Sequence, residues 1–365
     1  MGLFPEIRRA WLTSGNALYL WSFENNRDFT HYLKSQYEII DVALVRPKSG
    51  VFNENVEWLI VVVTPMEIIL LATTFESPDK TGSVFNVEHG KEFKNYSNFD
   101  LTLHETGLNF PSDEVNMVSV CGTENGRIFL AGSDGNVYEL NYQQESDWFS
   151  SKCKKINRTA SALSYIVPTF LRSSSNRACI VKLTYDASRH IIYGLTEQST
   201  IHVYWLGANC HEFEFVGVTG DLSSEAMKLT PAGIISSSKA LDIISIHPVD
   251  YSESEIINLI AICRSGIRLY FSIIGPAQSN INNFALAAQM NSQLSSQAPR
   301  GIRLAHLRAP PEENRVRDPK KLVHRWSPNI HCALYSNGVT LAANAISNEE
   351  DALLGMIINP SVGSS

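Results

Sequence analysis

Short apolar runs separated by tight polar turns recur along the chain. The runs are rich in Val, Ile and aromatic residues, which is typical of β-strands joined as hairpins. Six such pairs of runs are present: "WLTSGNALYLW", "WLIVVVTPMEIILLAT", "IFLAGSDGNVYEL", "IIYGLTEQSTIHVYWL", "LIAICRSGIRLYFS" and "CALYSNGVTLAA". Their turns centre near Asn16, Pro65, Asp134, Gln198, Ser265 and Asn337. The pattern therefore predicts six β-hairpins.

The spacing of these hairpins favours one repeated architecture. A hairpin cannot bury its apolar faces alone, so a recurring hairpin indicates that like units stack on one another. Four-stranded blades around a central axis fit this best, and the predicted fold class is an all-β β-propeller. We expect residues 1–365 to form a single propeller domain, with exposed loops near residues 76–109, 275–299 and 308–321 and with one short amphipathic helix at most.

Composition adds limits to this picture. The chain has 365 residues, 44% of them hydrophobic and 18% charged, so it has enough apolar material for a core. The net charge of −7 makes a general nucleic-acid binder a poor interpretation, because such binders rely on phosphate contacts. The six cysteines form no C-x-x-C pair, and no signal peptide opens the chain, so a cytosolic or nuclear protein is expected. The run from Trp58 to Thr73 is short for a membrane helix and contains Pro65 and Glu67.

The "GSDG" stretch around Asp134 has two readings. Its aspartate and glycines could hold a cation or a phosphate, or they could form a hairpin turn. A calcium loop needs several spaced oxygen ligands, and a P-loop leads into a helix, whereas Gly135 leads into the strand-like "NVYEL". Asp-Gly between alternating apolar runs is a strong hairpin signal. We predict a turn, with Ile128, Leu130, Val137 and Leu140 contributing to the core.

Signatures of catalysis are missing from the sequence. It contains neither H-E-x-x-H nor a G-x-S-x-G nucleophile elbow, and no carboxylate pair can be singled out. His324 and His331, with Cys332, could form a zinc site, but three ordinary surface or half-buried residues are the favoured interpretation. The prediction is a protein that is not an enzyme, with no catalytic residue, no cofactor and no metal.

A short basic segment stands out in this acidic chain. "WFSSKCKKINRTAS" gathers Lys152, Lys154, Lys155 and Arg158 within seven positions. Such a segment can dock an acidic partner or a membrane headgroup surface. It can equally be a solvated loop, and the sequence leaves both interpretations open.

The stretch from Gly275 to Pro299 carries no charged residue. Wound as a helix, its second half places apolar side chains on one broad face and Ser and Gln side chains on the other. That arrangement is typical of a helix that inserts into loosely packed bilayers, although Ser- and Gln-rich loops are often simply disordered. The candidate membrane-contact residues are Phe284, Leu286, Ala287, Met290 and Leu294.

Several long motifs together resemble one protein family. They are "LFPEIRRAWLTSGNALYLW", "VRPKSGVF", "VVTPMEIILLA", "NGRIFLAGSDGNVYELNYQ", "WFSSKCKKINRT", "GIRLYFS" and "HCALYSNGV", and they occur in this order over nearly the whole chain. The chain resembles the N-terminal domain of the large non-repetitive nucleoporins of the 155/170-kDa type. The match does not depend on propeller periodicity, which many unrelated proteins share.

The resemblance implies a seven-bladed β-propeller and a structural role in the inner ring of the nuclear pore complex, in support of nucleocytoplasmic transport of protein and mRNA. The implied partners are other inner-ring and linker nucleoporins, a pore-membrane protein and, peripherally, the nuclear envelope membrane. Neither direct nucleic-acid binding nor a small-molecule substrate is implied. The family pattern also leads us to expect about a hundred residues upstream and an α-helical solenoid downstream, so that the propeller is incomplete here.

Two alternatives belong to other functional classes. A propeller enzyme such as a hydrolase would gather acids or metal ligands at one end of its blades, and no such cluster can be read from the sequence. A propeller of another membrane-coat assembly would not account for the long motifs.

Overall fold

A computed structural model describes most of the chain, in segments with gaps between them. The described residues are 1–23, 28–76, 85–88, 91–94, 96–113, 115–143, 153–160, 178–230, 238–275, 298–308, 330–335, 339–344 and 356–358. Within them the chain forms two compact units, Met1–Ala162 and Leu163–Ser365.

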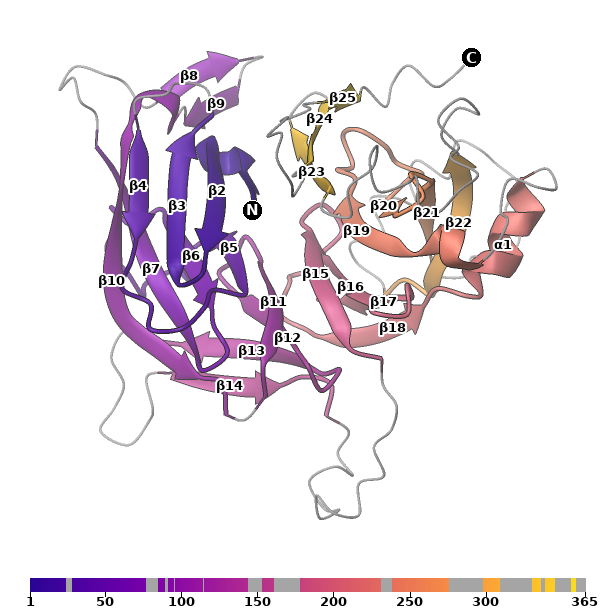
Figure 1. The fold of residues 1–365 in the computed structure, drawn as a ribbon, viewed down its shortest axis with the longest axis horizontal. Helices are drawn as coiled ribbons and strands as arrows, with labels where there is room; N and C mark the ends of the chain where they lie inside the picture. Colours follow the sequence, from indigo (N-terminus) through magenta and orange to yellow (C-terminus); the bar gives the residue numbers. More distant parts are fainter. Residues whose placement is uncertain are drawn as a thin grey trace, which may run out of the picture. The chain divides into compact units, whose positions relative to one another are not determined.

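The first unit contains three four-stranded antiparallel sheets (Figure 1). The first sheet has the order β1-β2-β3-β4, the second β10-β7-β6-β5 and the third β11-β12-β13-β14. Their strands are β1 (Gly2–Phe4), β2 (Arg9–Ser14), β3 (Ala17–Ser22), β4 (Phe29–Tyr32), β5 (Asp41–Val45), β6 (Trp58–Val63), β7 (Glu67–Glu76), β10 (Asp100–Pro111), β11 (Met117–Gly122), β12 (Ile128–Gly132), β13 (Val137–Tyr142) and β14 (Cys153–Asn157).

Shorter elements join these strands. The 3-10 helices η1 (Pro5–Ile7) and η2 (Tyr96–Asn98) precede β2 and β10, respectively. A two-stranded hairpin, β8 (Phe85–Glu88) and β9 (Lys91–Lys94), lies between β7 and β10 in the sequence. Most of the predicted loop 76–109 is therefore regular structure, and its last ten residues belong to β10, the strand that completes the second sheet.

The second unit repeats the same plan. Its sheets have the orders β15-β16-β17-β18 and β19-β20-β21-β22, followed by the three strands β23-β24-β25. The strands are β15 (Ile180–Asp186), β16 (Ile191–Thr196), β17 (Ile201–Trp205), β18 (Glu214–Val218), β19 (Ile243–Pro248), β20 (Leu259–Cys263), β21 (Arg268–Ile274), β22 (Gly301–Arg308), β23 (Ile330–Tyr335), β24 (Val339–Asn344) and β25 (Met356–Ile358).

One α-helix occurs in the described part of the second unit. Helix α1 (Leu222–Leu229) lies between β18 and β19 in the sequence, followed by the 3-10 helix η5 (Ser238–Leu241). Asp221 caps α1 by accepting a hydrogen bond from the Ser223 N–H (3.1 Å). The sequence pattern does not predict this helix. The amphipathic helix expected around Phe284 lies outside the described residues.

All six predicted hairpins are confirmed. They are the pairs β2–β3, β6–β7, β12–β13, β16–β17, β20–β21 and β23–β24. In each of the five four-stranded sheets the predicted hairpin supplies the two central strands. Most residues of these strands are buried or half-buried, and β6, β12 and β16 are buried at every position, which explains why their apolar runs are nearly continuous and hence conspicuous in the sequence.

Consecutive sheets pack face to face within each unit. In β6, Trp58, Ile60 and Val62 join a core shared with the first sheet. The alternate residues of β6, Leu59, Val61 and Val63, join a core shared with the third sheet. A further core, which includes Val203 and Leu269, fills the space between the first two sheets of the second unit.

Equivalent strands of neighbouring sheets touch in a regular way. The first strands β5 and β11 are in contact in one unit, as are β15, β19 and β23 in the other. Among the last strands, β10 contacts both β4 and β14, and β18 contacts β22. This is the relation between successive blades of a β-propeller, and the all-β fold class is confirmed.

Candidate functional site

A cleft of about 590 Å³ opens in the first unit where β4 ends. Strand β4 lies beside β10 and stops at Tyr32, whereas β10 runs on to Pro111 (Figure 1). One wall is formed by the segment that follows β4, and the other by the turn before β7 and the second half of β10. The lining residues are Tyr32, Lys34, Gln36 and Tyr37 on the first wall and Met66, Glu67, Ile69, Glu105, Thr106, Gly107, Asn109, Phe110 and Pro111 on the second.

A β-bulge shapes the second wall. The pairing of β10 with β7 shifts between Glu105 and Asn109, so three residues of β10 have no partner in the ladder. Gly107 takes a φ of +71°, which residues with a Cβ rarely adopt. The Thr106 hydroxyl donates to the Leu70 carbonyl (2.7 Å) and thereby satisfies a ladder acceptor that the bulge would leave open. The bulge therefore fixes a local bend in β10 beside the cleft.

The cleft combines apolar and acidic groups. Met66 and Tyr37 are 54% and 39% exposed, whereas Ile69 is buried and belongs to the core shared with the first sheet. Glu105 pairs with Lys34 (3.3 Å) in a solvent-exposed contact, and Glu67 accepts a hydrogen bond from the Asn109 amide (3.3 Å). Burial, together with the negative charges of Glu105 and Glu67, raises the pKa of the Tyr32 hydroxyl. The arrangement suits contact with an apolar group next to a positive charge.

Asp134 and Gly135 form a hairpin turn, as predicted. Gly135 has a φ of +77°, and its N–H donates to the Gly132 carbonyl (3.0 Å). Both carboxylate oxygens of Asp134 are used locally: one accepts from the Asn136 N–H, the other from the Asn136 amide and the Tyr138 hydroxyl (2.6 Å). The four expected core residues of this hairpin, Ile128, Leu130, Val137 and Leu140, are buried.

Two residues of the basic segment, Lys155 and Arg158, are bound to other residues of the chain. The Lys155 ammonium is buried, donates to the Ser112 carbonyl and lies 5.2 Å from the centre of the Tyr138 ring. Arg158 is held by Glu139 (2.5 Å) and is 37% exposed. Lys154 is exposed, and Lys152 lies outside the described residues. Two of the four predicted docking residues thus also have a structural role.

Glu139 binds two arginines at once. Its carboxylate accepts two hydrogen bonds from Arg127 (2.8 and 2.9 Å) in addition to the bond from Arg158. Burial alone would raise the pKa of Glu139, but the hydrogen bonds and positive charges of Arg127 and Arg158 outweigh it and hold the pKa below its usual value. Both arginines come from strands or turns adjacent to β13, so this cluster stabilises the third sheet.

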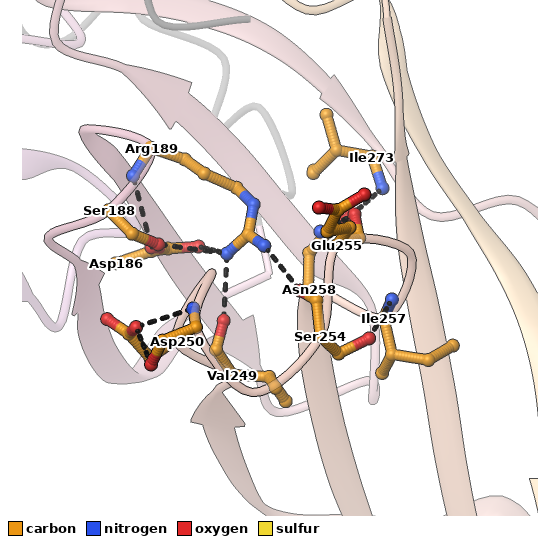
Figure 2. A network of polar contacts seen from close by, with 11 residues as sticks. Asp186, Ser188, Arg189, Val249, Asp250, Ser254, Glu255, Ile257, Asn258 and Ile273 are labelled. Atoms are coloured by element: carbon orange, nitrogen blue, oxygen red, sulfur yellow. Dashed lines mark hydrogen bonds and ion pairs between the residues drawn. The ribbon is translucent and has the colours of Figure 1, made fainter. Parts of the chain in front are cut away.

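Two other buried clusters are each formed by an arginine that binds a carboxylate and backbone carbonyls of the chain. In the second unit, the Arg189 guanidinium points at Asp186 and at two carbonyls of the turn between β19 and β20 (Figure 2). In the first unit, Arg9 contacts Asp28 (2.7 Å) and the carbonyls of Ile7, Tyr96 and Phe99. The guanidinium donors in both clusters are directed at fixed protein acceptors, so we assign them to holding neighbouring sheets together.

The remaining candidates do not add a chemical site. Phe284, Leu286, Ala287, Met290 and Leu294 all lie outside the described residues, as does His324. Across the described segments, no three His, Cys, Asp or Glu side chains gather as metal ligands would. The helices in those segments are also too short or too polar to cross a membrane.

Sequence reasoning missed the cleft because it depends on a bulge and on where β4 ends. The available signal was Thr106-Gly107 inside an alternating stretch, since a glycine within a strand often marks a bulge.

Comparisons with known proteins agree with the resemblance seen in the motifs. A family model described as "Nup133 N terminal like" matches residues 1–350. The nuclear pore complex protein Nup154 of Drosophila melanogaster is 32% identical over 380 residues, covering 99% of this chain and 26% of that protein. A probable nucleoporin of Schizosaccharomyces pombe is 33% identical over 316 residues, covering 85% and 22%.

A solved structure shows the same fold. The crystal structure of a complex of the Chaetomium thermophilum Nup170 N-terminal domain with Nup53 matches with a TM-score of 0.67 and 27% identity, covering 94% of this chain and 44% of that one. The chain spans about a quarter of the length of the curated relatives it matches. On the family match and these similarities, the chain belongs to the nucleoporins with a Nup133-like N-terminal domain, and it resembles the 155/170-kDa type.

Proposed function

We propose that this chain is a structural module of the nuclear pore complex at the nuclear envelope, which holds other nucleoporins in place and thereby supports transport between nucleus and cytoplasm. The observation that carries the proposal is the family match over residues 1–350, together with relatives named as nuclear pore proteins. Membership of this family also argues for a scaffold rather than an enzyme.

Binding of another nucleoporin is the contact with the most support. The similar Nup170 domain was solved as a complex with Nup53. In this chain, the cleft beside β10 offers exposed apolar side chains next to carboxylates, which is chemistry suited to a protein partner. A pore-membrane protein and further inner-ring nucleoporins complete the proposed set of partners.

Contact with the nuclear membrane is the second part of the proposal. It assigns membrane insertion to Phe284, Leu286, Ala287, Met290 and Leu294, and headgroup attraction to Lys152 and Lys154 with a smaller share from Lys155 and Arg158. Flotation with small, highly curved liposomes tests it. Phe284→Asp with Leu294→Asp should reduce flotation, whereas Ser292→Asp with Ser296→Asp, on the opposite face, should reduce it less. Equal flotation of the wild type and both double variants would contradict membrane insertion.

The scaffold role itself is tested in cells. The chain, within its full-length protein and fused to a proximity-labelling enzyme, should label nuclear pore proteins at the nuclear rim. A fusion protein distributed evenly through the cytoplasm, with no enrichment of nucleoporins among the labelled proteins, would contradict it.

A further inference from the structure

Strand β10 has a hydrogen-bonding edge that is only partly covered. At Leu101, the N–H donates to the Asp28 carboxylate (3.4 Å) and the C=O accepts from the Thr30 hydroxyl (2.6 Å), both on the side away from β7. In an antiparallel strand, residues two apart direct their backbone groups to the same side. Leu103 and Glu105 therefore face the same edge, and none of the described residues forms a hydrogen bond with their outward N–H or C=O groups.

The cleft begins where this cover ends. Asp28 and Thr30 reach β10 from β4 and the residue just before it, but β4 stops at Tyr32. Beyond that point β10 continues through Glu105 and the bulge to Pro111 along the wall of the cleft. Open backbone groups next to an apolar hollow are the features that an added strand uses: main-chain hydrogen bonds give affinity, and pockets for alternate side chains give specificity.

We propose that the cleft binds an extended segment of a partner protein as an additional strand along the free edge of β10. An apolar side chain of this segment enters the hollow over Ile69, on the face of the sheet that also carries Glu67 and Glu105, and a Lys or Arg side chain lies between these two carboxylates. This inference rests on the proposed function, because it names how a protein partner is held. It adds the site, the backbone geometry and the charge of the partner.

Charge complementarity distinguishes this occupant from others. Glu67 and Glu105 outnumber Lys34 on the cleft walls, so a phosphate-bearing ligand such as a nucleic acid or an anionic lipid would be repelled. Lys34 is 71% exposed where it pairs with Glu105, so a partner cation can replace it at little cost. An extended polypeptide is the ligand that can use the open backbone edge as well as the acidic rim.

The test begins with a random peptide library displayed on phage and selected against the full 365-residue chain. Selected peptides should carry a Lys or Arg close to an apolar residue. The variant Glu67→Lys with Glu105→Lys should bind them at least about tenfold more weakly, because it reverses the charge of the rim. Glu253→Lys with Glu255→Lys, which makes the same charge change in the second unit, is the matched control and should bind like the wild type.

Hydrogen–deuterium exchange supplies the readout for strand addition. A bound peptide should slow the exchange of residues 100–111 and leave residues 186–190 unchanged. The inference is overturned if no peptide is selected, if both double variants bind equally, or if β10 gains no protection. Any of these results would leave the nuclear pore assignment standing, since that is judged by proximity labelling in cells.

Discussion

Arg189 and Asp186 form a buried ion pair within a single turn. Arg189 Nη1 lies 2.9 Å from Asp186 Oδ2, and the two side chains are only 5% and 2% exposed. The same guanidinium donates to the carbonyls of Val249 (2.8 Å) and Ser254 (2.9 Å) in the turn between β19 and β20. One side chain thus links two consecutive sheets of the second unit, as Figure 2 shows.

Replacing Arg189 with Leu should destabilise the second unit strongly. The change leaves the Asp186 carboxylate and two carbonyls without their buried donor, and losing one partner of a buried pair costs about 3–5 kcal/mol. Urea unfolding followed by tryptophan fluorescence, to which the buried Trp205 of this unit contributes, and by circular dichroism measures the loss. The matched control is Arg264→Ala, which removes an exposed pair with Asp242 and should cost less than about 1 kcal/mol. Equal losses in the two variants would show that Arg189 does not clamp the sheets.

Glu139 should make the free energy of unfolding fall at acidic pH. Because Arg127 and Arg158 hold its pKa below the usual 4.5, the folded chain binds this proton less readily than the unfolded chain. The contribution is therefore complete above pH 4.5 and is lost as the pH falls from 4.5 through the lowered pKa. Glu139→Gln should cost about 2 kcal/mol at pH 7, and the difference from the wild type should shrink progressively below pH 4.5.

The measurement is the free energy of unfolding of both proteins between pH 7 and pH 3. The exposed residue Glu253 provides the control, since Glu253→Gln removes a solvent-exposed carboxylate and should cost less than about 1 kcal/mol at pH 7. A difference for Glu139→Gln that stays constant down to pH 3 would refute the role of the ionised carboxylate.

The central hairpins of the sheets could be predicted from the sequence because most residues of their strands are buried, which makes their apolar runs nearly continuous. Strand β6, "WLIVVV", is buried at every position. Strand β10 was missed because it lies at a sheet edge, where about every second residue is polar, and because Thr106 and Gly107 interrupt its alternation. Helix α1 was missed because eight residues give too short an apolar stripe; only Asp221 at its start and Pro231 after its end marked it.

The candidate site was less predictable than the fold. Sequence reasoning looks for groups that do chemistry, and it therefore examined Asp134, which it assigned to a turn, and selected the basic segment. Asp134 is used within its own turn, and Lys155 is bound to the loop that follows β10. The cleft depends instead on the end of β4, the bulge in β10 and the uncovered backbone between them, which involve residues about 70 positions apart and leave no local motif.

Gly107 should tolerate one substitution and resist another. The backbone there has a φ of +71°, and an added Cβ would meet no atom within 4 Å, so the cost of a side chain is conformational rather than steric. Gly107→Ala should destabilise by about 1 kcal/mol, whereas Gly107→Asn should recover most of the loss because asparagine enters this region more readily. Thermal unfolding of the two variants and the wild type checks the order. If the two variants are equally destabilised, the left-handed conformation of Gly107 is not the cause.

Gly126 should behave differently, although its φ of +83° is similar. An added Cβ would lie 2.5 Å from the backbone N and Cα of Lys48, and a backbone cannot move aside as a flexible side chain can. The contact is fixed further by Tyr142, whose hydroxyl donates to the Gly126 carbonyl (2.8 Å) and accepts from the Lys48 N–H (3.0 Å).

Both Gly126→Ala and Gly126→Asn should therefore lose roughly 1–3 kcal/mol of stability beyond the conformational cost. Because the steric overlap of the added Cβ with Lys48 dominates, Gly126→Asn should be no more stable than Gly126→Ala. Thermal unfolding of these variants beside those of Gly107 compares the two sites directly. Recovery of stability by Gly126→Asn would mean that Lys48 and Gly126 are less closely packed than 2.5 Å implies.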